Sequence, residues 1–128
     1  MARAERARFL DGASRIGMQL CRDALWSADR CSWTGPSVDY TTGRPIVSER
    51  TLGPTVYDGT AGVAWFLGAL FRATGEPIFR FVADGALEHA LTRAKDLAGE
   101  LRWSFYSGLP GIASLPGQVS TCTAAVQA

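Results

Sequence analysis

Apolar positions along the chain form three helical patterns separated by loops. The first covers residues 4–26, where apolar side chains recur every three or four positions at Phe9, Ala13, Ile16, Leu20 and Ala24. This spacing predicts an amphipathic helix that packs on a larger body. Between this helix and residue 60 the periodicity disappears, and several Gly and Pro residues indicate loops.

The second pattern begins at Thr60, which can cap a helix, and contains no charged residue before Arg72. A helix that is apolar on every side must be surrounded by protein, because an exposed face would leave large side chains in water. Gly62 and Gly68 each cost about 1 kcal/mol relative to Ala within a helix. Their presence predicts close backbone packing at those points.

The third pattern covers residues 77–97. Gly75 is placed to end the preceding helix in a left-handed conformation, and Pro77 suits the first turn of the next. One apolar stripe follows: Phe79, Val82, Ala83, Ala86, Ala90 and Ala94. The polar face carries Arg80, Asp84 and Glu88 at i, i+4 spacing, which predicts a half-exposed helix.

Residues 27–58 contain one candidate for regular structure. The segments 38–40 and 45–47 are rich in β-forming residues and flank a Thr-Thr-Gly-Arg turn, so a small β-hairpin is expected there. The fold class predicted from these patterns is therefore all-α, with a small hairpin in the 27–58 loop.

A repeat relates two parts of the chain. YDGTAGVA at residues 57–64 matches YSGLPGIA at residues 106–113, with an offset of 49 residues. Units of this length are typical of helical-pair repeats, in which neighbouring units bury the inner helices by stacking or ring closure.

These motifs resemble a known family. The segments 57–67, 72–77 (RATGEP) and 105–113 look like the first repeats of lanthionine synthetase C-like proteins, and residues 20–26 with 31–33 are similar to the preceding helix and loop. The resemblance covers about residues 9–114. It implies the first repeats of an α/α toroid with seven inner helices, of which this chain holds two.

The resemblance also implies a chemistry. Complete members hold one zinc ion through two cysteines and a histidine, and they join a cysteine thiolate of a precursor peptide to a dehydroalanine or dehydrobutyrine, forming a lanthionine thioether. The zinc ligands belong to later repeats, in a Cys-Gly-like turn and a Cys-His pair. This chain has no Cys-His pair. We therefore expect no catalytic, cofactor-binding or metal-ligating residue here, and zinc only in the full-length family.

The last residues depart from the family pattern. Pro116 and Gly117 interrupt the inner helix that should continue after Ala113, and a proline inside a helix costs about 3 kcal/mol. We therefore expect residues 1–114 to be the toroid part and residues 115–128 to be a non-native or disordered tail of a truncated or frameshifted reading frame, inactive alone.

Individual reactive residues have plain structural interpretations. His89, beside Glu88, is expected on the solvated surface, and Cys21 as a small buried hydrophobe. Asp58 is either a polar residue of the inner rim or an acid favoured by a helix N-terminus. The Gly-Thr-Ala-Gly turn at residues 59–62 is interpreted as packing rather than anion binding. The tryptophans are expected in the core or an interface: Trp26, Trp33, Trp65 and Trp103.

Composition limits partners and location. The 128 residues carry a formal net charge of +1, which gives no electrostatic reason to expect nucleic acid or an anionic membrane. The charged start of the chain argues against a signal peptide, and three cysteines without a CxxC pair are typical of reduced thiols, so a cytoplasmic location is expected.

Three functional hypotheses follow. The first is a lanthionine synthetase C-like fragment whose complete form modifies a precursor peptide. The second is the start of a six-hairpin glycosidase-type toroid, for which the turns supply no pair of carboxylates. The third is a helical scaffold or peptide-binding piece that self-associates through the uncovered apolar face of residues 63–71.

Overall fold

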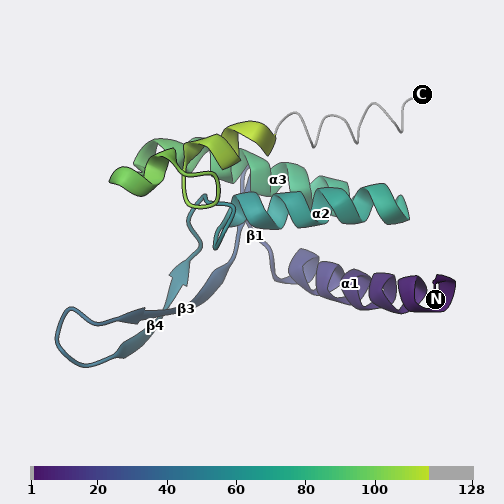
Figure 1. Ribbon diagram of the computed structural model, residues 1–128, viewed down its shortest axis with the longest axis horizontal. Coiled ribbons are helices and arrows are strands. Elements are labelled where there is room, and N and C mark those ends of the chain that lie inside the picture. Colours follow the sequence, from purple (N-terminus) through teal and green to yellow (C-terminus); the bar gives the residue numbers. More distant parts are fainter. Residues whose placement is uncertain (1, 116–128) are drawn as a thin grey trace.

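The computed structural model describes residues 2–115 and is mostly helical, with two small hairpins. The elements in chain order are α1 (Arg3–Asp23), β1 (Leu25–Ser27), β2 (Arg30–Ser32), β3 (Thr34–Asp39), β4 (Ile46–Thr51), α2 (Thr60–Thr74), α3 (Pro77–Arg93), η1 (Ala94–Asp96) and η2 (Glu100–Trp103). Residues 109–115 are helical again. In Figure 1, α1 lies beneath α2 and α3. The β3–β4 hairpin projects from the end of the molecule that lies away from the N-terminus of α1.

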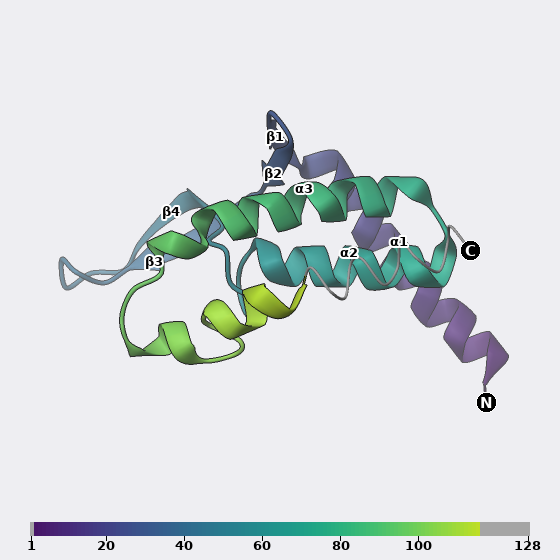
Figure 2. The ribbon, with the colours of Figure 1, turned by 90° about the horizontal axis from the view of Figure 1, so that it is seen from above.

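Helices α2 and α3 form an antiparallel pair (Figure 2), joined at the turn that the sequence predicts. Gly75 ends α2 with a left-handed φ of 73°, and its N–H donates to the Phe71 carbonyl across 2.7 Å. Pro77 opens α3, since its fixed φ suits a first helical turn. The predicted apolar stripe of α3 is buried from Phe79 to Ala90. On the polar face, Arg80 Nε lies 3.8 Å from Asp84 Oδ2 in an ion pair. Regular α-helix ends at Arg93, before the predicted 97.

The α2–α3 pair carries the hydrophobic core. Its largest fully buried side chains include Phe79, Leu67, Ile112 and Leu115. Ile112 and Leu115 come from the helical residues 109–115, which pack beside α2 and extend the core of the pair. Figure 2 shows this returning segment alongside the start of α2, with α3 on the other side of α2.

Helix α1 crosses the pair at Gly17. A Cβ there would overlap a methyl group of Leu70 and lie 3.0 Å from the Phe79 ring, so any larger residue would require these buried side chains to shift. Two residues of the predicted stripe are exposed instead, Phe9 at 77% and Ile16 at 59%. That part of the prediction is wrong, because the face of α1 that carries Gly17 is the one that meets the core.

Two hairpins follow α1. The predicted one is confirmed and is longer than expected: β3 pairs with β4 from Thr34↔Thr51 to Asp39↔Ile46. The β1–β2 hairpin was not predicted, and the first helix therefore ends at Asp23 and not near residue 26. Gly85 of α3 receives this hairpin, since a Cβ there would lie 2.6 Å from the Trp26 ring and 2.9 Å from the Cys31 sulfur.

Helix α2 is covered on one face only. Ala61, Ala64 and Leu67 are fully buried, whereas Trp65 is 37% exposed. The expectation that protein surrounds this helix is not met within residues 2–115. Thr60 is the first helical residue and not the cap, a position taken by Gly59. Residues 115–128 were expected to form a non-native or disordered tail. Leu115 is helical and buried, and residues 116–128 lie outside the described residues.

Candidate functional site

The repeated motif forms two copies of one turn. At Gly62 a Cβ would collide with the carbonyl oxygen of Val56, and at Gly111 with that of Phe105. In both cases the colliding backbone lies six residues earlier. Each Gly-x-x-Gly segment thus folds the preceding turn tightly against the first turn of an inner helix. This close packing supports the structural interpretation of the glycines.

The two turns contact each other directly. The N–H of Tyr57 donates to the carbonyl of Tyr106 across 2.8 Å. A methyl group of Val56 also packs against Gly111, where a Cβ would lie only 2.8 Å from it. The repeats are therefore neighbours in space, joined at the N-terminal ends of α2 and the helix of residues 109–115. Repeats that contact their neighbours in this way are the basis of solenoid and toroid architectures.

A hydroxyl residue stabilises each turn. The Asp58 N–H donates to Thr55 Oγ1 at 3.4 Å, and the Ser107 N–H donates to Ser104 Oγ at 3.2 Å, again 49 residues apart. In the first turn the Thr55 hydroxyl also donates to the Asp58 carboxylate. This carboxylate is held by the turn, and it is the acidic group that borders the groove described next.

An apolar groove runs along the uncovered face of α2. It consists of two adjoining hollows of about 300 and 340 Å³ that share Val56, Gly62 and Phe66. Trp65 lines the first hollow, and Tyr57 with Asp58 lines the second. We call this surface the aromatic groove. Its shape and lining suit an apolar segment of chain, since a ligand groove is mostly apolar with few polar groups.

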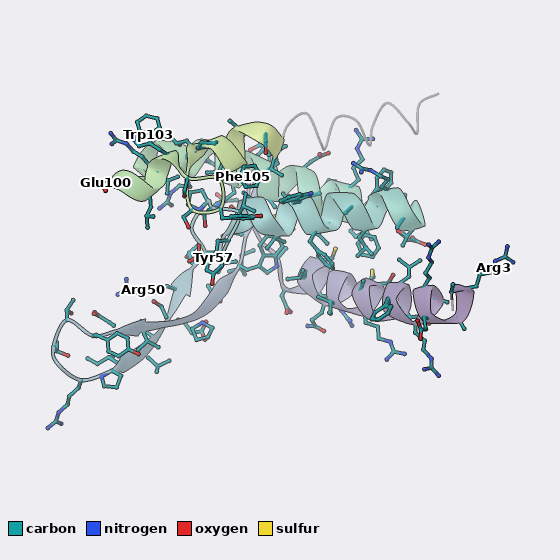
Figure 3. All side chains as sticks on the ribbon, in the orientation of Figure 1. Arg3, Arg50, Tyr57, Glu100, Trp103 and Phe105 are labelled. Atoms are coloured by element: carbon teal, nitrogen blue, oxygen red, sulfur yellow. The ribbon has the colours of Figure 1, made fainter. Side chains whose placement is uncertain are left out.

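Aromatic rings border the aromatic groove. Trp65 and Phe105 meet edge to face with ring centroids 6.1 Å apart, and Phe105 meets Tyr106 at 5.2 Å. Tyr57 and Tyr106 are 78% and 61% exposed. Figure 3 shows Tyr57 below Phe105, where the hairpin joins the helices. Exposed rings gathered at one edge are typical of interaction surfaces.

The tryptophans divide between core and surface. Trp33 is buried, and its indole N–H donates to the Leu20 carbonyl at 2.8 Å, which satisfies one of the unpaired carbonyls at the end of α1. Trp26 contacts Phe81 at 5.0 Å between centroids. Trp103 is 66% exposed and points away from the helices, with the Arg102 guanidinium over its ring. Within residues 2–115 Trp33 therefore lies in the core and Trp103 does not, and an interface position for Trp103 stays a prediction.

His89 is buried, which corrects the expectation of a surface histidine. Only 8% of it is exposed, and its Nδ1 lies 2.8 Å from the Thr60 hydroxyl. Burial lowers the pKa of His89 below its usual 6.5, and the guanidinium groups of Arg93 and Arg30 lower it further. The sequence did hold a signal, because position 89 is three residues after Ala86 and falls on the apolar stripe of α3.

The described residues do not fit a zinc site of the family's type. Cys31 is 1% exposed, its thiol donates to the Val82 carbonyl at 3.5 Å, and burial raises its pKa to about 12. Burial also raises the pKa of Cys21. His89 is already bonded to Thr60. No group of three His, Cys, Asp or Glu within residues 2–115 could hold a metal ion. Cys122 lies outside the described residues.

The repeated turn, each copy of which leads into a helix, together with the α2–α3 pair is typical of a helical-repeat protein. Residues 50–122 match the family model described as lanthionine synthetase C-like protein, which is more than half of the chain. The chain therefore belongs to the lanthionine synthetase C-like family. No curated protein and no solved structure matches it. Among the described residues, no helix combines the length and apolar character needed to cross a bilayer.

Proposed function

We propose that this chain supplies the first two repeats of a lanthionine synthetase C-like α/α toroid and serves as scaffold and peptide-facing rim. The observation that carries the proposal is the direct pairing of the two Gly-x-x-Gly turns through Tyr57 and Tyr106. Family membership supports the toroid, since that architecture is what the family resemblance implies.

The uncovered face of α2 also supports the toroid. Trp65 and Phe66 face the aromatic groove although no charge occurs in the helix before Arg72. Burying apolar surface stabilises by about 25 cal/mol for each Å² removed from water. Further inner helices of a toroid would cover this face and gain that stabilisation, whereas in this structure it remains in contact with solvent.

We further propose that the complete toroid performs zinc-dependent thioether cyclisation of a precursor peptide and that this chain alone is inactive. The proposal rests on family membership for the reaction. The partner of the assembled protein is then the precursor peptide. The inactivity of the chain is supported by the poor fit of Cys21, Cys31 and His89 to a zinc site. No step of the reaction is assigned to residues 2–115.

A cyclisation assay tests this. The purified chain is incubated with zinc and a dehydrated precursor peptide, and free peptide thiols are then capped with N-ethylmaleimide and counted by mass spectrometry, because cyclisation itself leaves the mass unchanged. We expect every thiol to be capped, as in a reaction without protein. A complete family cyclase with its own peptide provides the positive control. Loss of capped thiols with this chain would overturn its assignment as a scaffold.

A second function is favoured by the exposed rings that border the aromatic groove. Tyr57, Trp65, Phe105 and Tyr106 form a surface that a second copy of the chain could cover. We propose that the separate chain self-associates through it and acts as a non-catalytic scaffold. Sedimentation over a range of protein concentrations tests this, and a strictly monomeric chain would contradict it.

A further inference from the structure

A cavity unrelated to the aromatic groove lies between the β1–β2 hairpin and α3. It has a volume of about 240 Å³. In Figure 2 the hairpin sits on the side of α3 that faces away from α2. Six of the residues that line the cavity carry hydrogen-bond donors: Ser27, Arg30, Ser32, Thr51, His89 and Arg93. We call it the hairpin cavity.

The charge of the hairpin cavity is positive. Arg30 and Arg93 line it, and no Asp or Glu does. Arg30 has no carboxylate partner among residues 2–115. Arg93 donates from Nε to Asp96 at 2.7 Å, which leaves its two terminal nitrogens for another acceptor. Both residues line the same cavity as His89, and their charges lower the pKa of His89 further after the effect of burial.

Unused hydroxyl groups face the same space. Ser27, Ser32 and Thr51 make no side-chain hydrogen bond to any residue within 2–115, yet Ser32 is only 9% exposed. No fully buried polar side-chain atom in that range lacks a partner, so these unpaired hydroxyls keep some exposure to solvent, and all three residues line the cavity. His89 bonds Thr60 through Nδ1, which leaves Nε2 as its unused ring atom.

We propose that the hairpin cavity binds the phosphate of a small molecule or inorganic phosphate, held by Arg30 and Arg93 with the hydroxyls of Ser27, Ser32 and Thr51. Guanidinium groups match phosphate oxygens in geometry and bind them through paired hydrogen bonds. Two guanidinium groups balance the charge of a phosphate dianion, and the surrounding hydroxyls supply donors for more oxygens than a carboxylate offers. The site is independent of the thioether chemistry and of the aromatic groove.

Calorimetric titration of the purified chain tests the proposal with inorganic phosphate, glycerol 3-phosphate and acetate as probes at low salt. We expect one phosphate per chain, with acetate at least tenfold weaker. Arg30→Gln should weaken phosphate binding tenfold or more. Arg44→Gln removes the same charge from the exposed β3–β4 turn and should change the affinity less than twofold.

Circular dichroism establishes whether each variant is folded. If Arg30→Gln is not folded, Ser32→Ala takes its place, and Ser32→Ala should weaken phosphate binding at least threefold. Tighter binding of glycerol 3-phosphate would assign a small phosphate ester as ligand, and tighter binding of inorganic phosphate the free ion. The proposal would be overturned if the wild type did not bind phosphate, if the cavity variants bound it as tightly as the wild type, or if Arg44→Gln weakened binding as much as Arg30→Gln. None of these results would affect the toroid assignment.

Discussion

The backbone N–H of Tyr57 and the carbonyl of Tyr106 form a 2.8 Å hydrogen bond between equivalent turns of the two repeats. The residues that match in the sequence also lie next to each other in space. This contact joins the starts of α2 and of the helix of residues 109–115, and the aromatic groove runs beside it. The sequence repeat is thus a structural repeat, which is what a stacked helical architecture requires.

The Gly-x-x-Gly turn should not tolerate a methyl group. We expect Gly62→Ala to lower the free energy of unfolding by at least about 1 kcal/mol, because its Cβ would meet the backbone oxygen of Val56 and not a movable side chain. Gly12→Ala is the matched control, since nothing lies within 4 Å of a Cβ there. It should stabilise the helix by about 0.5–1 kcal/mol. Urea unfolding measures both, and equal effects would contradict the packing account.

Helix α1 should depend on Gly17. A Cβ at this position overlaps Leu70 and approaches Phe79, and such overpacking costs about 1–3 kcal/mol. We expect Gly17→Ala to loosen α1 from the α2–α3 pair. Amide hydrogen exchange should then rise in residues 13–23 and stay unchanged in α3. Uniform exchange in both helices would show that α1 is not seated at Gly17.

The bond between His89 and Thr60 should matter to stability. We expect Thr60→Val to cost about 1–3 kcal/mol, because it leaves a buried imidazole nitrogen without a partner. Thr92→Val is the matched control. It removes an exposed hydroxyl of α3 that donates to the Glu88 carbonyl. That control should change the free energy of unfolding by less than about 0.5 kcal/mol. Equal losses would argue against a role for the buried pair.

His89 should also make stability depend on pH. Its pKa is lowered in the folded chain, so the unfolded chain binds a proton there first as the pH falls. The stabilisation is fully present above about pH 6.5 and is lost as the pH falls toward the folded pKa. The stability difference between the wild type and His89→Asn should therefore shrink between pH 7 and pH 5. A constant difference across that interval would contradict the lowered pKa.

The aromatic groove should drive association of the separate chain. Trp65→Ser removes a ring that lines the groove, and we expect it to weaken self-association several-fold in sedimentation experiments. Trp103→Ser removes a ring that is more exposed, at 66% against 37%, but lies outside the groove. It should leave association unchanged. If both variants weaken association alike, general hydrophobicity and not the groove is responsible.

Strong local signals predicted much of the fold. Gly75 and Pro77 marked the α2–α3 junction, and the apolar period placed Phe79 and Ala90 in the core, because these signals act within one or two helical turns. The repeat at residues 57–64 and 106–113 predicted both turns and the family. These features depend on residues close together in the chain.

Features that depend on tertiary contacts were missed. The β1–β2 hairpin has strands of only three residues, and it is stabilised by packing on Gly85 rather than by its own pattern. Of the one apolar stripe predicted for α1, Ala13, Leu20 and Ala24 pack against the core, whereas Phe9 and Ile16 are exposed, because the helix meets the core at Gly17. His89 looked polar beside Glu88, although its buried partner Thr60 lies 29 residues away. The helical period of α3 places His89 on the buried face, but it does not identify Thr60 as the partner.

Complementation of a shortened cyclase tests whether these two repeats begin a toroid. This chain is mixed with a lanthionine synthetase C-like cyclase from which the first two repeats have been deleted, and the mixture is assayed by size-exclusion chromatography with light scattering and by thiol capping of a dehydrated peptide. We predict a one-to-one complex that restores thioether formation, and weaker assembly with Trp65→Ser. Two folded proteins that elute separately and leave every thiol free would show that these repeats are not the start of a toroid.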